Sequence, residues 1–571
     1  MGRADITVYE RGMCMFGWGQ PENVALGVAL PLYARALVVE CPNTRRRVGY
    51  VCADLGFISQ HLRQKVLERI AERGVMLDEH DVMITATHTH SGPNGYSTYL
   101  FYSVTGPGFA PRVVDGLARG IVRALERAIA TLAPARLTLH TTSVPLVETV
   151  SFNRSIAAYN LNDDVRPLPP DRSDEAVDRA LTLLRVDDAS SGRARGFLCW
   201  FPVHGTSIHF ENTLLHPDNK GVAARDCEER AARVEPRSGS DERDSFVAIF
   251  AQESAGDVTP NFRWSPKRRL LVGKHDDDFE SAEHAGRVQA RHAWDAFREA
   301  PSRGVELRGA LSGQIRYRDF ASIAVDPDFA RGREGRATSV ACLGLGFAYG
   351  TLEGPGPAFA LRAVNPVLSK LVAWCRRRRG RDWRSMHGSK VRFFDLGYGA
   401  RGNVMTSLST RPPGFQLLPD SRVAYYCRVL DSGRLGDHPW VPQVLPTQIL
   451  LVGSLAIVGI PAEPTTVSGR RMRSTVASAL APIGVDRVVV NGYANAYAAY
   501  VTTEEEYRLQ HYEAASTLFG RWTLAAWRTE LRRLAGDMVH RRQRSPKFDS
   551  LRPALGDEPL RFRDHELLPS V

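Results

Sequence analysis

Two short runs of the sequence carry histidines at spacings that suit a metal ion. In TATHTHSGPNG (85–95), His88 and His90 stand two positions apart after an apolar stretch, and in WFPVHGTSIHFENTLLHPDNKG (200–221), His204 follows a second apolar stretch. Side chains of a strand alternate between its faces, so we expect His88 and His90 to point to the same side. Neutral imidazole is the commonest metal ligand, and one histidine of the pair can bind an ion while the other acts as a base. By itself the pattern fits two hydrogen-bonded structural histidines equally well.

Two further polar turns follow apolar, strand-like segments. AQESAGDVTPN (251–261) contains Thr259, whose hydroxyl can serve as a nucleophile, as a hydrogen-bond partner of a substrate, or as a helix cap. Its spacing alone favours the helix cap. GIPAEPTTVSGRR (459–471) places Glu463 between an apolar strand and a helix, where a carboxylate is either a metal ligand or a partner of the helix dipole.

Other polar residues of these runs are predicted to have structural roles. His209 and His216 are interpreted as surface histidines. The run 491–516 is rich in tyrosine, and such tyrosines more often line a core or a cleft than take part in catalysis; among them are Tyr497, Tyr500 and Tyr512. The glycine-rich run GLGFAYG lacks the spacing of a dinucleotide-binding loop and is interpreted as close strand packing. The chain has no HExxH helix, no GxSxG turn and no P-loop.

Strand-like and helical segments alternate along the chain. Segments 35–40 and 48–55 are predicted to pair as strands, and 59–74 to follow as an amphipathic helix, because its apolar residues recur at intervals of three and four. The further predicted strands are 81–90, 135–144, 196–207, 245–254 and 448–460, and the further predicted helices are 113–133, 468–481 and 507–536. This order predicts an α/β fold with sheets sheltered by helices.

Composition excludes several classes of protein. The 571 residues are 43% hydrophobic and 24% charged, which is typical of a globular chain and not of a disordered or fibrous one. Eight scattered cysteines form no CxxC pair, and no apolar stretch is long enough to span a bilayer. No secretory signal is apparent, so the sequence predicts a soluble, cytoplasmic protein. The net charge of +11, with arginine runs in 376–384 and 541–544, fits an anionic partner, but solvated loops are the simpler interpretation.

Several long motifs share one order along the chain and extend from residue 15 to about residue 535. They are MFGWGQPENVALGVALPLYARALVV (15–39), THTHSGP (87–93), SFNRS (151–155), DNKG (218–221), AGDVTPN (255–261), GTLEGPGP (350–357), GIPAEPTTVSGRRMR (459–473) and YVTTEEEYRLQHYEAAST (500–517). In these motifs the sequence resembles the neutral (non-lysosomal) ceramidase family. Members of that family are zinc-dependent hydrolases that cleave the amide of N-acylsphingosine. The resemblance further implies one large catalytic domain with mixed sheets layered between helices.

The resemblance implies a set of site residues. One Zn²⁺ per chain is expected, and the family's ligands fall on His88, His204, Glu463 and Tyr500. Three further family residues fall near the reacting centre, and they are His90, Arg154 of the NRS motif and Tyr512, which is expected to assist the carbonyl oxygen. No other cofactor is implied.

Two departures from the family pattern are visible. Thr259 stands where the family has an essential serine, and its extra methyl group restricts the side chain beside the metal. The second concerns the ends of the sequence, where we expect neither the signal segment nor the C-terminal immunoglobulin-like domain of typical family members. We therefore expect a hydrolase domain over 1–540, followed by a short tail over 541–571.

The expected activity is hydrolysis of an N-acyl amide, either ceramide or a related and shorter N-acyl compound. Amide or ester formation, or acyl transfer, at the same zinc site is the first alternative, and a non-catalytic lipid-binding relative is the second. The expected partners are a small-molecule or lipid N-acyl amide and, peripherally, an anionic membrane. Nucleic acid is not expected, because the charge is its only support.

Overall fold

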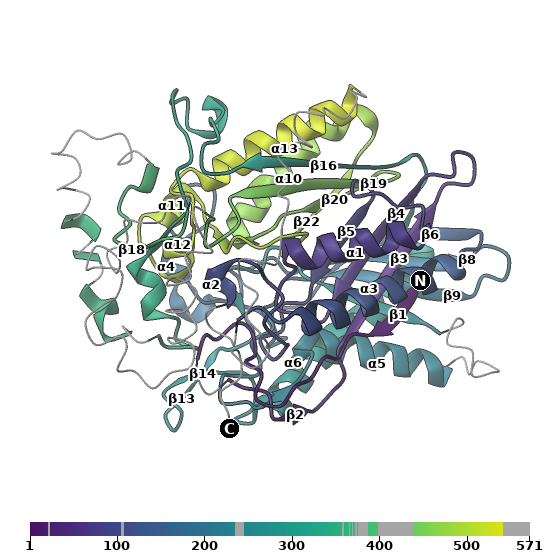
Figure 1. Ribbon diagram of the computed structural model, residues 1–571, viewed down its shortest axis with the longest axis horizontal. Helices are drawn as coiled ribbons and strands as arrows, with labels where there is room; N and C mark the ends of the chain where they lie inside the picture. The colour runs from purple at the N-terminus through teal and green to yellow at the C-terminus, as the bar shows by residue number, and fades with distance from the viewer. Residues whose placement is uncertain are drawn as a thin grey trace.

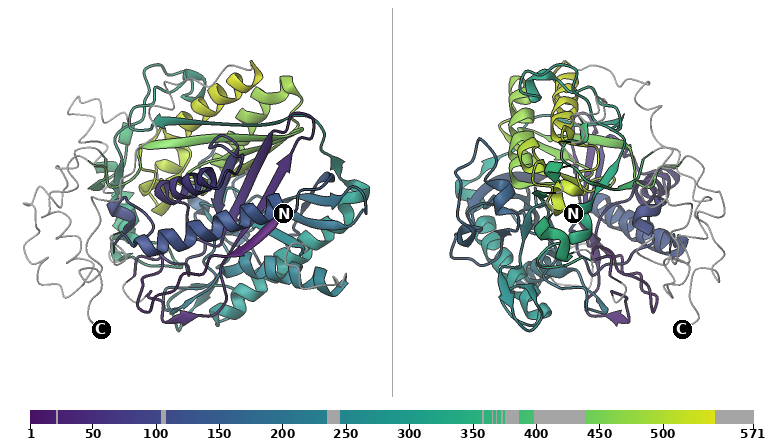
Figure 2. Two further views of the ribbon diagram at one scale, coloured as in Figure 1. Left: turned by 45° about the vertical axis from the view of Figure 1, so that its right-hand side comes forward. Right: turned by 90° about the vertical axis from the view of Figure 1, so that its left-hand side faces the viewer.

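Three β-sheets, each covered by a pair of helices, make up most of the protein (Figures 1 and 2). The computed structural model describes residues 1–20, 23–103, 108–234, 245–356, 359–364, 366–367, 369–371, 374, 386–397 and 438–540. The arginine runs and the predicted tail 541–571 lie outside these described residues.

The first sheet has the strand order β1-β3-β4-β5. Its members are β1 (Gly2–Asp5), β3 (Tyr33–Glu40), β4 (Arg47–Ala53) and β5 (Val82–Ala86), covered by α1 (Gln60–Glu72) and α3 (Pro111–Ala130). The predicted strand pair and the helix after it are confirmed, and Ser59 caps α1 by accepting a hydrogen bond from the Leu62 amide. However, β5 ends at Ala86, so the predicted strand 81–90 stops before its histidines.

The second sheet has the order β11-β9-β8-β6-β15 and is covered by two long helices. Its strands are β6 (Ala135–Ser143), β8 (Ala180–Asp188), β9 (Ala194–Trp200), β11 (Val247–Ala251) and β15 (Val305–Glu306), and the helices are α5 (Asp218–Val234) and α6 (Asp278–Arg303). β9 and β11 run parallel at one edge, so the loops after them begin at the same end of the sheet. Those loops carry two of the sequence motifs.

The third sheet has the order β16-β19-β20-β22. It consists of β16 (Leu311–Asp319), β19 (Val444–Val452), β20 (Leu455–Gly459) and β22 (Arg487–Asn491), under α10 (Thr466–Leu480) and α13 (Thr523–Val539). The prediction of one strand over 448–460 is wrong, because Gly453 adopts φ +60° and turns the segment into the hairpin β19–β20. Continuous apolarity cannot distinguish one long strand from two short buried ones.

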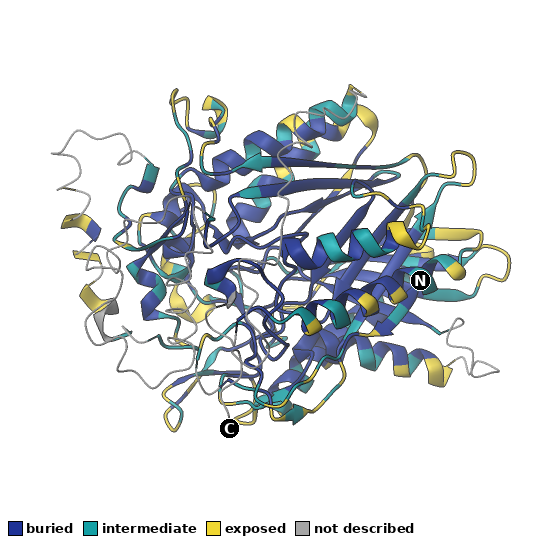
Figure 3. Ribbon diagram, viewed as in Figure 1, coloured by how far each residue is buried: buried dark blue, intermediate teal, exposed yellow. Residues whose placement is uncertain are grey.

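The inner faces of the three sheets meet in one shared core. Tyr50 and Met83 of the first sheet, Leu198 and Trp200 of the second, and Ile457 of the third belong to this cluster. The opposite faces pack against the helices, and the exposed residues in Figure 3 lie mainly on the outer sides of those helices and at loop tips. Successive residues of each strand therefore pack alternately into the shared core between the sheets and into a core between a sheet and its helices.

Short elements lie around the ends of the sheets. The two-stranded pairs are β2 (Gly27–Val28) with β10 (Leu214–Leu215), β7 (Phe152–Asn153) with β12 (Val258–Thr259), β13 (Arg263–Ser265) with β14 (Leu270–Val272), β17 (Cys342–Gly344) with β18 (Arg392–Asp395), and β21 (Glu463–Pro464) with β23 (Tyr500–Val501). The short helices are α2 (Leu100–Ser103), α4 (Ile156–Tyr159), α11 (Glu504–Tyr507), α12 (Tyr512–Ala515), η1 (Pro170–Arg172), η3 (Pro327–Phe329), η4 (Leu345–Tyr349), η5 (Phe359–Val364) and η7 (Ala481–Ile483). Most of the sequence motifs lie on these elements.

Two predicted segments differ from the structure. The helix predicted over 507–536 is divided into α11, α12 and α13, because Gln510 and Gly520 have φ values of +53° and +93° that interrupt it. GLGFAYG forms the 3₁₀ helix η4 and not a strand, although Gly346 does allow close packing, against Gln510 and Ala515. Within the described residues, no helix is both long and apolar enough to cross a membrane.

Candidate metal centre

Three buried imidazoles converge at one point. Nε2 of His88 lies 3.2 Å from Nε2 of His204 and 3.2 Å from Nε2 of His90. Potential ligand atoms of the three residues all lie within 4.8 Å of one another, a spacing that suits a metal ion. The structure thus brings together three histidines that the sequence analysis named separately.

Loops, and not the pleat of a strand, bring the histidines together. His88 lies two residues beyond β5 and has φ +67°, a left-handed backbone conformation that is uncommon for residues other than glycine. Thr89 pairs with Gly205, and the amide of His90 donates to the Gly205 carbonyl. A Cβ at Gly205 would lie 2.2 Å from the His88 carbonyl oxygen, so glycine is required for this close approach.

Backbone carbonyls determine how two of the rings are turned. Nδ1 of His88 donates to the Gly56 carbonyl, and Nδ1 of His204 donates to the Ala255 carbonyl at 2.7 Å. Each Nε2 then carries a lone pair directed at the centre, as a metal ligand requires. Nδ1 of His90 is buried and has no such partner within the described residues.

Burial also keeps the rings of His88 and His90 neutral. Burial and the neighbouring His204 lower the pKa of His88 to about 4, although Glu463 acts against this. Burial together with His88 and His204 holds the pKa of His90 well below its ordinary value. Neutral imidazoles are the form that binds cations and accepts protons.

Glu463 completes the cluster from β21, four residues after the end of β20. Its Oε2 lies 3.2 Å from Nε2 of His204 and 3.5 Å from Nε2 of His88. The hydroxyls of Tyr493 and Tyr497 donate to the two carboxylate oxygens. Although burial favours the protonated form, the histidines and the Tyr497 hydroxyl hold the pKa of Glu463 well below its ordinary value. The carboxylate is therefore ionised and can balance the charge of a cation.

Tyr500 lies directly beside Glu463, because β21 and β23 pair in parallel with these two residues in register. The Arg154 guanidinium donates to the Tyr500 hydroxyl at 3.0 Å. Burial raises the pKa of Tyr500 well above its ordinary value, so the phenol is neutral in the absence of a cation. The structure thus brings Tyr500 to the edge of the cluster.

Arg154 connects the cluster to two carboxylates. Its Nη1 donates to Glu353 at 2.7 Å, and its Nε donates to Glu513 at 2.8 Å. Its Nη2 donates to the Gly256 carbonyl as well as to Tyr500. The guanidinium carbon lies 5.8 Å from the ring centre of Tyr512, so the predicted residues Arg154 and Tyr512 are neighbours.

Glu353 is a site residue that sequence reasoning missed. Its Oε2 accepts hydrogen bonds from the hydroxyls of Thr259 and Thr206 and, at 2.8 Å, from the side-chain amide of Asn261. Against the effect of burial, Arg154, His204 and the donors Thr259 and Asn261 keep the pKa of this carboxyl below its ordinary value. In the sequence, the only indication of a role for Glu353 is its position in the glycine-rich motif GTLEGPGP.

Thr259 is not the helix cap that its spacing suggested. It lies on β12, and its hydroxyl accepts a hydrogen bond from the Asn261 amide at 3.0 Å while donating its own proton to Glu353. No helix follows it, because the chain continues from Asn261 into β13. The side chain is therefore held at the site by its neighbours.

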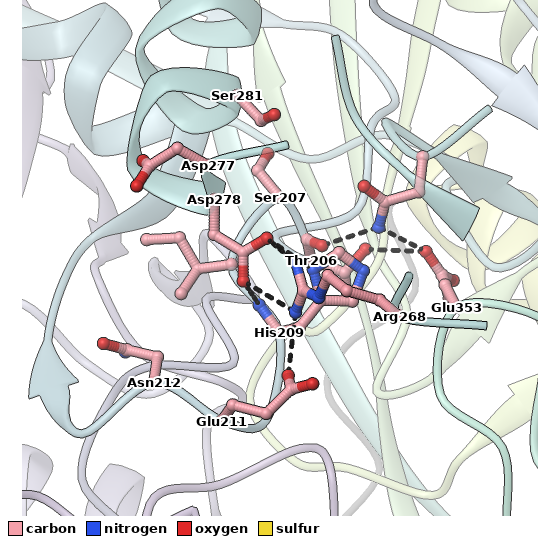
Figure 4. A network of polar contacts seen from close by, with 12 residues as sticks. Thr206, Ser207, His209, Glu211, Asn212, Arg268, Asp277, Asp278, Ser281 and Glu353 are labelled. Atoms are coloured by element: carbon pink, nitrogen blue, oxygen red, sulfur yellow. Dashed lines mark hydrogen bonds and ion pairs between the residues drawn. The ribbon is translucent and has the colours of Figure 1, made fainter. Parts of the chain in front are cut away.

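The prediction that His209 and His216 are surface histidines is wrong, because both are buried. His209 is held by Asp278 and by the Leu271 carbonyl, each at 2.9 Å, and Arg268 contacts the same carboxylate (Figure 4). Nδ1 of His216 accepts a hydrogen bond from the backbone amide of Asp218. Neither histidine belongs to the metal cluster, so a structural role fits both.

A cavity of about 560 Å³ extends from Arg154 and Tyr512 toward the surface. Its walls combine apolar and polar groups, among them Tyr349, Leu352 and Phe359. A compact site of this kind, with apolar walls and a few polar groups at its end, is typical of binding sites for small molecules and lipid chains.

Fold and site define an α/β enzyme with a buried imidazole–carboxylate cluster that is compatible with a metal ion. The sequence matches the family model of the neutral/alkaline non-lysosomal ceramidase, N-terminal, over residues 1–405 and 427–529. The chain belongs to this family and is an enzyme of the hydrolase class.

Individual relatives agree with this assignment. The chain is 35% identical to the neutral ceramidase of Pseudomonas aeruginosa over 529 residues, covering 92% of the chain and 70% of the relative. It is 32% identical to the neutral ceramidase of Mycobacterium tuberculosis over 546 residues, covering 94% and 76%.

Solved structures confirm the predicted α/β fold. The crystal structure of the Pseudomonas aeruginosa neutral ceramidase matches with a TM-score of 0.73 at 32% identity, covering 95% of this chain and 74% of that one. A ceramidase complexed with C2 matches with a TM-score of 0.76 at 34% identity, covering 95% and 75%.

Proposed function

We propose that this enzyme hydrolyses the amide bond of an N-acylsphingosine or a closely related N-acyl lipid, with one Zn²⁺ bound by His88, His204, Glu463 and Tyr500. The observation that carries the proposal is the convergence of neutral imidazole nitrogens and an ionised carboxylate oxygen at 3.2–3.5 Å. Two nitrogens, a carboxylate and a phenolic oxygen are ligands that zinc accepts, and they leave room for a water molecule.

The orientation of each ring assigns different roles to the three histidines. Carbonyls hold Nδ1 of His88 and His204, which leaves the Nε2 lone pair of each ring available to a metal ion and supports their role as ligands. His90 lacks such a partner and is free to carry its proton on either nitrogen. We therefore assign His90 to proton transfer, in which it accepts a proton during attack and passes it to the leaving amine.

When bound, zinc supplies a Lewis acid that polarises the acyl carbonyl and lowers the pKa of a water molecule. The chain itself orients the substrate. The contacts of Arg154 leave one N–H on Nη1, and both Arg154 and Tyr512 line the cavity. Both can donate to the carbonyl oxygen as negative charge develops on it.

Thr259 is best suited to orienting substrate or water. Its proton is already donated to Glu353, so its oxygen can accept a hydrogen bond but has no free proton to offer. Glu353 holds Thr259 and Arg154 at the same time, and we include it among the positioning residues. Nucleophilic attack by Thr259 would require Glu353 to take up that proton while it remains paired with Arg154.

Metal analysis and a substrate panel test this proposal. Purified protein should contain one zinc per chain and release fatty acid from ceramides, and chelation should abolish turnover until zinc is restored. The panel should include ceramides of several chain lengths and small N-acyl amino compounds. Full turnover in metal-free protein would contradict the proposal, and cleavage of the small compounds alone would reassign the substrate.

The alternatives are not favoured by any described contact. Bond formation or acyl transfer would use the same residues, and membership in a hydrolase family argues against a non-catalytic role. The cytoplasmic location stays a prediction.

A further inference from the structure

His90 is held by a different kind of contact from the other two histidines of the cluster. Carbonyls hold Nδ1 of His88 and His204, whereas Nδ1 of His90 is buried and makes no hydrogen bond with a described residue. The side chain of His90 has its polar contact at Nε2, 3.2 Å from Nε2 of His88. The χ2 angle of a histidine has a broad range, so the orientation of this ring must be set by the groups packed against it.

The segment MFGW (15–18), part of the first sequence motif, supplies some of this packing. The Phe16 amide donates to the Gly92 carbonyl at 3.1 Å, so the segment runs beside the loop that follows His90. Gly17 has φ +118°, and a Cβ at this position would lie 2.4 Å from Cγ and Nδ1 of His90. Glycine is therefore required where the backbone lies directly against the ring.

Trp18 packs against the same ring with its side chain. The ring centres of Trp18 and His90 lie 5.1 Å apart, with an angle of 74° between the ring planes, which is the edge-to-face arrangement that aromatic rings favour. Phe16 lies farther from His90, at 6.3 Å between ring centres. Of the described ring contacts that His90 makes outside the metal cluster, the contact with Trp18 is thus the shortest.

Three contacts in turn hold Trp18. Its Nε1–H donates to the Ile208 carbonyl at 3.2 Å, and its ring stacks on His209 with centres 5.6 Å apart and planes 18° apart. Asp278 holds His209 in place (Figure 4). Gly354 makes room for the indole, since a Cβ there would lie 2.5 Å from the Trp18 ring. The loss of any one contact, such as the stacking on His209, leaves the other two.

We propose that Trp18 is a positioning residue, which holds the His90 ring in the orientation that His90 needs for proton transfer. The proposal rests on the proposed function for the role of His90, and on the contacts of Trp18 for the orientation of the ring. A displacement of about 1 Å in a reacting group can cost roughly a hundredfold in rate. Trp18 does not itself line the described cavity, so we expect the effect on kcat and not on KM.

Crystallography of the zinc-loaded enzyme tests the orientation of the ring without any substrate. His90 should adopt one orientation in the wild type and a rotated or divided one in Trp18→Ala, while His88 and His204 stay in place because carbonyls hold them. Trp18→Phe keeps an aromatic ring beside His90 and should preserve the wild-type orientation. If Trp18→Ala does not fold, Trp18→Leu replaces it here and in the kinetic experiment. An unchanged His90 ring in the variant would overturn the proposal.

A double-mutant cycle tests whether Trp18 acts through His90. Trp18→Ala should lower kcat about tenfold to a hundredfold, with zinc content and KM close to the wild type, and Trp18→Phe should restore most of the activity. In a His90→Ala background, Trp18→Ala should cost nothing further, because the group that it positions is absent. An equal loss in both backgrounds would overturn the proposal and give Trp18 a general structural role.

Tyr9→Ala is the matched control. It removes a 38% exposed aromatic side chain from the same N-terminal segment, and Tyr9 makes no ring contact with any described residue. Its kcat, KM and zinc content should equal those of the wild type.

The two experiments separate this proposal from the proposed function. If the wild type cleaves no N-acyl substrate, the proposed function fails, while the crystal structures still show whether Trp18 holds His90. If the wild type is an active zinc hydrolase and Trp18→Ala has its full kcat, only the positioning role of Trp18 fails.

Discussion

His204 and His209 lie five residues apart in the same loop, and both are buried beside a carboxylate, yet they differ in what their nitrogens contact. Both nitrogens of His209 have separate partners, Asp278 and the Leu271 carbonyl. Nε2 of His204 instead faces another imidazole nitrogen and Glu463.

The difference shows how a structural histidine can be told from a ligand. Two imidazole lone pairs and a carboxylate that face one point repel one another unless a cation or a proton is shared there. At His209 each ring nitrogen is satisfied within the protein, and Arg268 neutralises the carboxylate. Residue type and burial are alike at the two sites, so only the direction of the nitrogens separates them.

The strongest test of this comparison replaces one histidine at each site. His204→Ala should lose the metal and nearly all activity, because the remaining ligands no longer surround the ion. His209→Gln should keep the metal and activity but lower the free energy of unfolding by about 1–3 kcal/mol, because the Asp278 contact is weakened. Zinc content and denaturant unfolding check both. Retained zinc in His204→Ala, or loss of zinc in His209→Gln, would reverse the assignment.

A variant of His90 tests whether this histidine differs in role from the two proposed ligands His88 and His204. His90→Ala should retain zinc and lose roughly 10²–10⁴-fold in kcat, because a proton-transfer group is removed while the ligands remain. Zinc analysis and single-turnover kinetics measure the two effects. Loss of zinc in step with activity would make His90 a ligand.

Glu353 and Glu513 offer a similar contrast around Arg154. Glu353→Gln should lower kcat by roughly 10²-fold, because the amide group turns a donor toward Thr259 and Asn261 and releases Arg154. Glu513→Gln, which leaves Thr259 untouched, should have a smaller effect. Measuring kcat and KM for both variants, with zinc content as control, shows whether the Glu353 variant loses more activity than the Glu513 variant. Equal effects in the two variants would remove the special role of Glu353.

Thr259 distinguishes orientation from nucleophilic attack. Thr259→Ser should retain most activity, whereas Thr259→Ala should lose about tenfold to a hundredfold with zinc unchanged, as expected for one lost hydrogen-bond partner. Mass spectrometry of trapped reaction mixtures should show no acylated threonine. An acyl-enzyme on Thr259 would establish it as the nucleophile.

The smallest expected effect concerns pH. His209 and Arg268 lower the pKa of Asp278 to about 2 against the effect of burial. Because this folded-state pKa is depressed, its stabilising contribution is complete above the ordinary pKa of an aspartate and disappears as pH falls through it toward 2. Denaturant unfolding at several pH values should show that Asp278→Asn removes this part of the acid sensitivity. If the pH dependence of the free energy of unfolding is the same in Asp278→Asn and the wild type, the contact between Asp278 and His209 does not contribute to acid stability.

Sequence reasoning found the separate polar turns because they follow apolar segments that become strands, and the family resemblance joined them into one set. His88, His204 and Glu463 each lie shortly after such a strand, one from each of the three sheets. The expected cause of the His88–His90 approach was wrong, since a left-handed residue and the Gly205 contact produce it. Local φ values of this kind depend on tertiary packing.

Other features could not be found from the sequence. The burial of His209 depends on Asp278, 69 residues later in the chain, and nothing in the local pattern shows that pairing. Glu353 likewise contacts Arg154 across 199 residues. Single acids in loops carry no periodic signal, so their partners appear only in three dimensions.

Anomalous diffraction at the zinc edge tests the central claim most directly. Crystals of active enzyme should show one peak bounded by Nε2 of His88, Nε2 of His204 and a Glu463 oxygen, within about 2.0–2.2 Å of each. Fully active crystals with no peak there, or with their only zinc elsewhere, would contradict the claim.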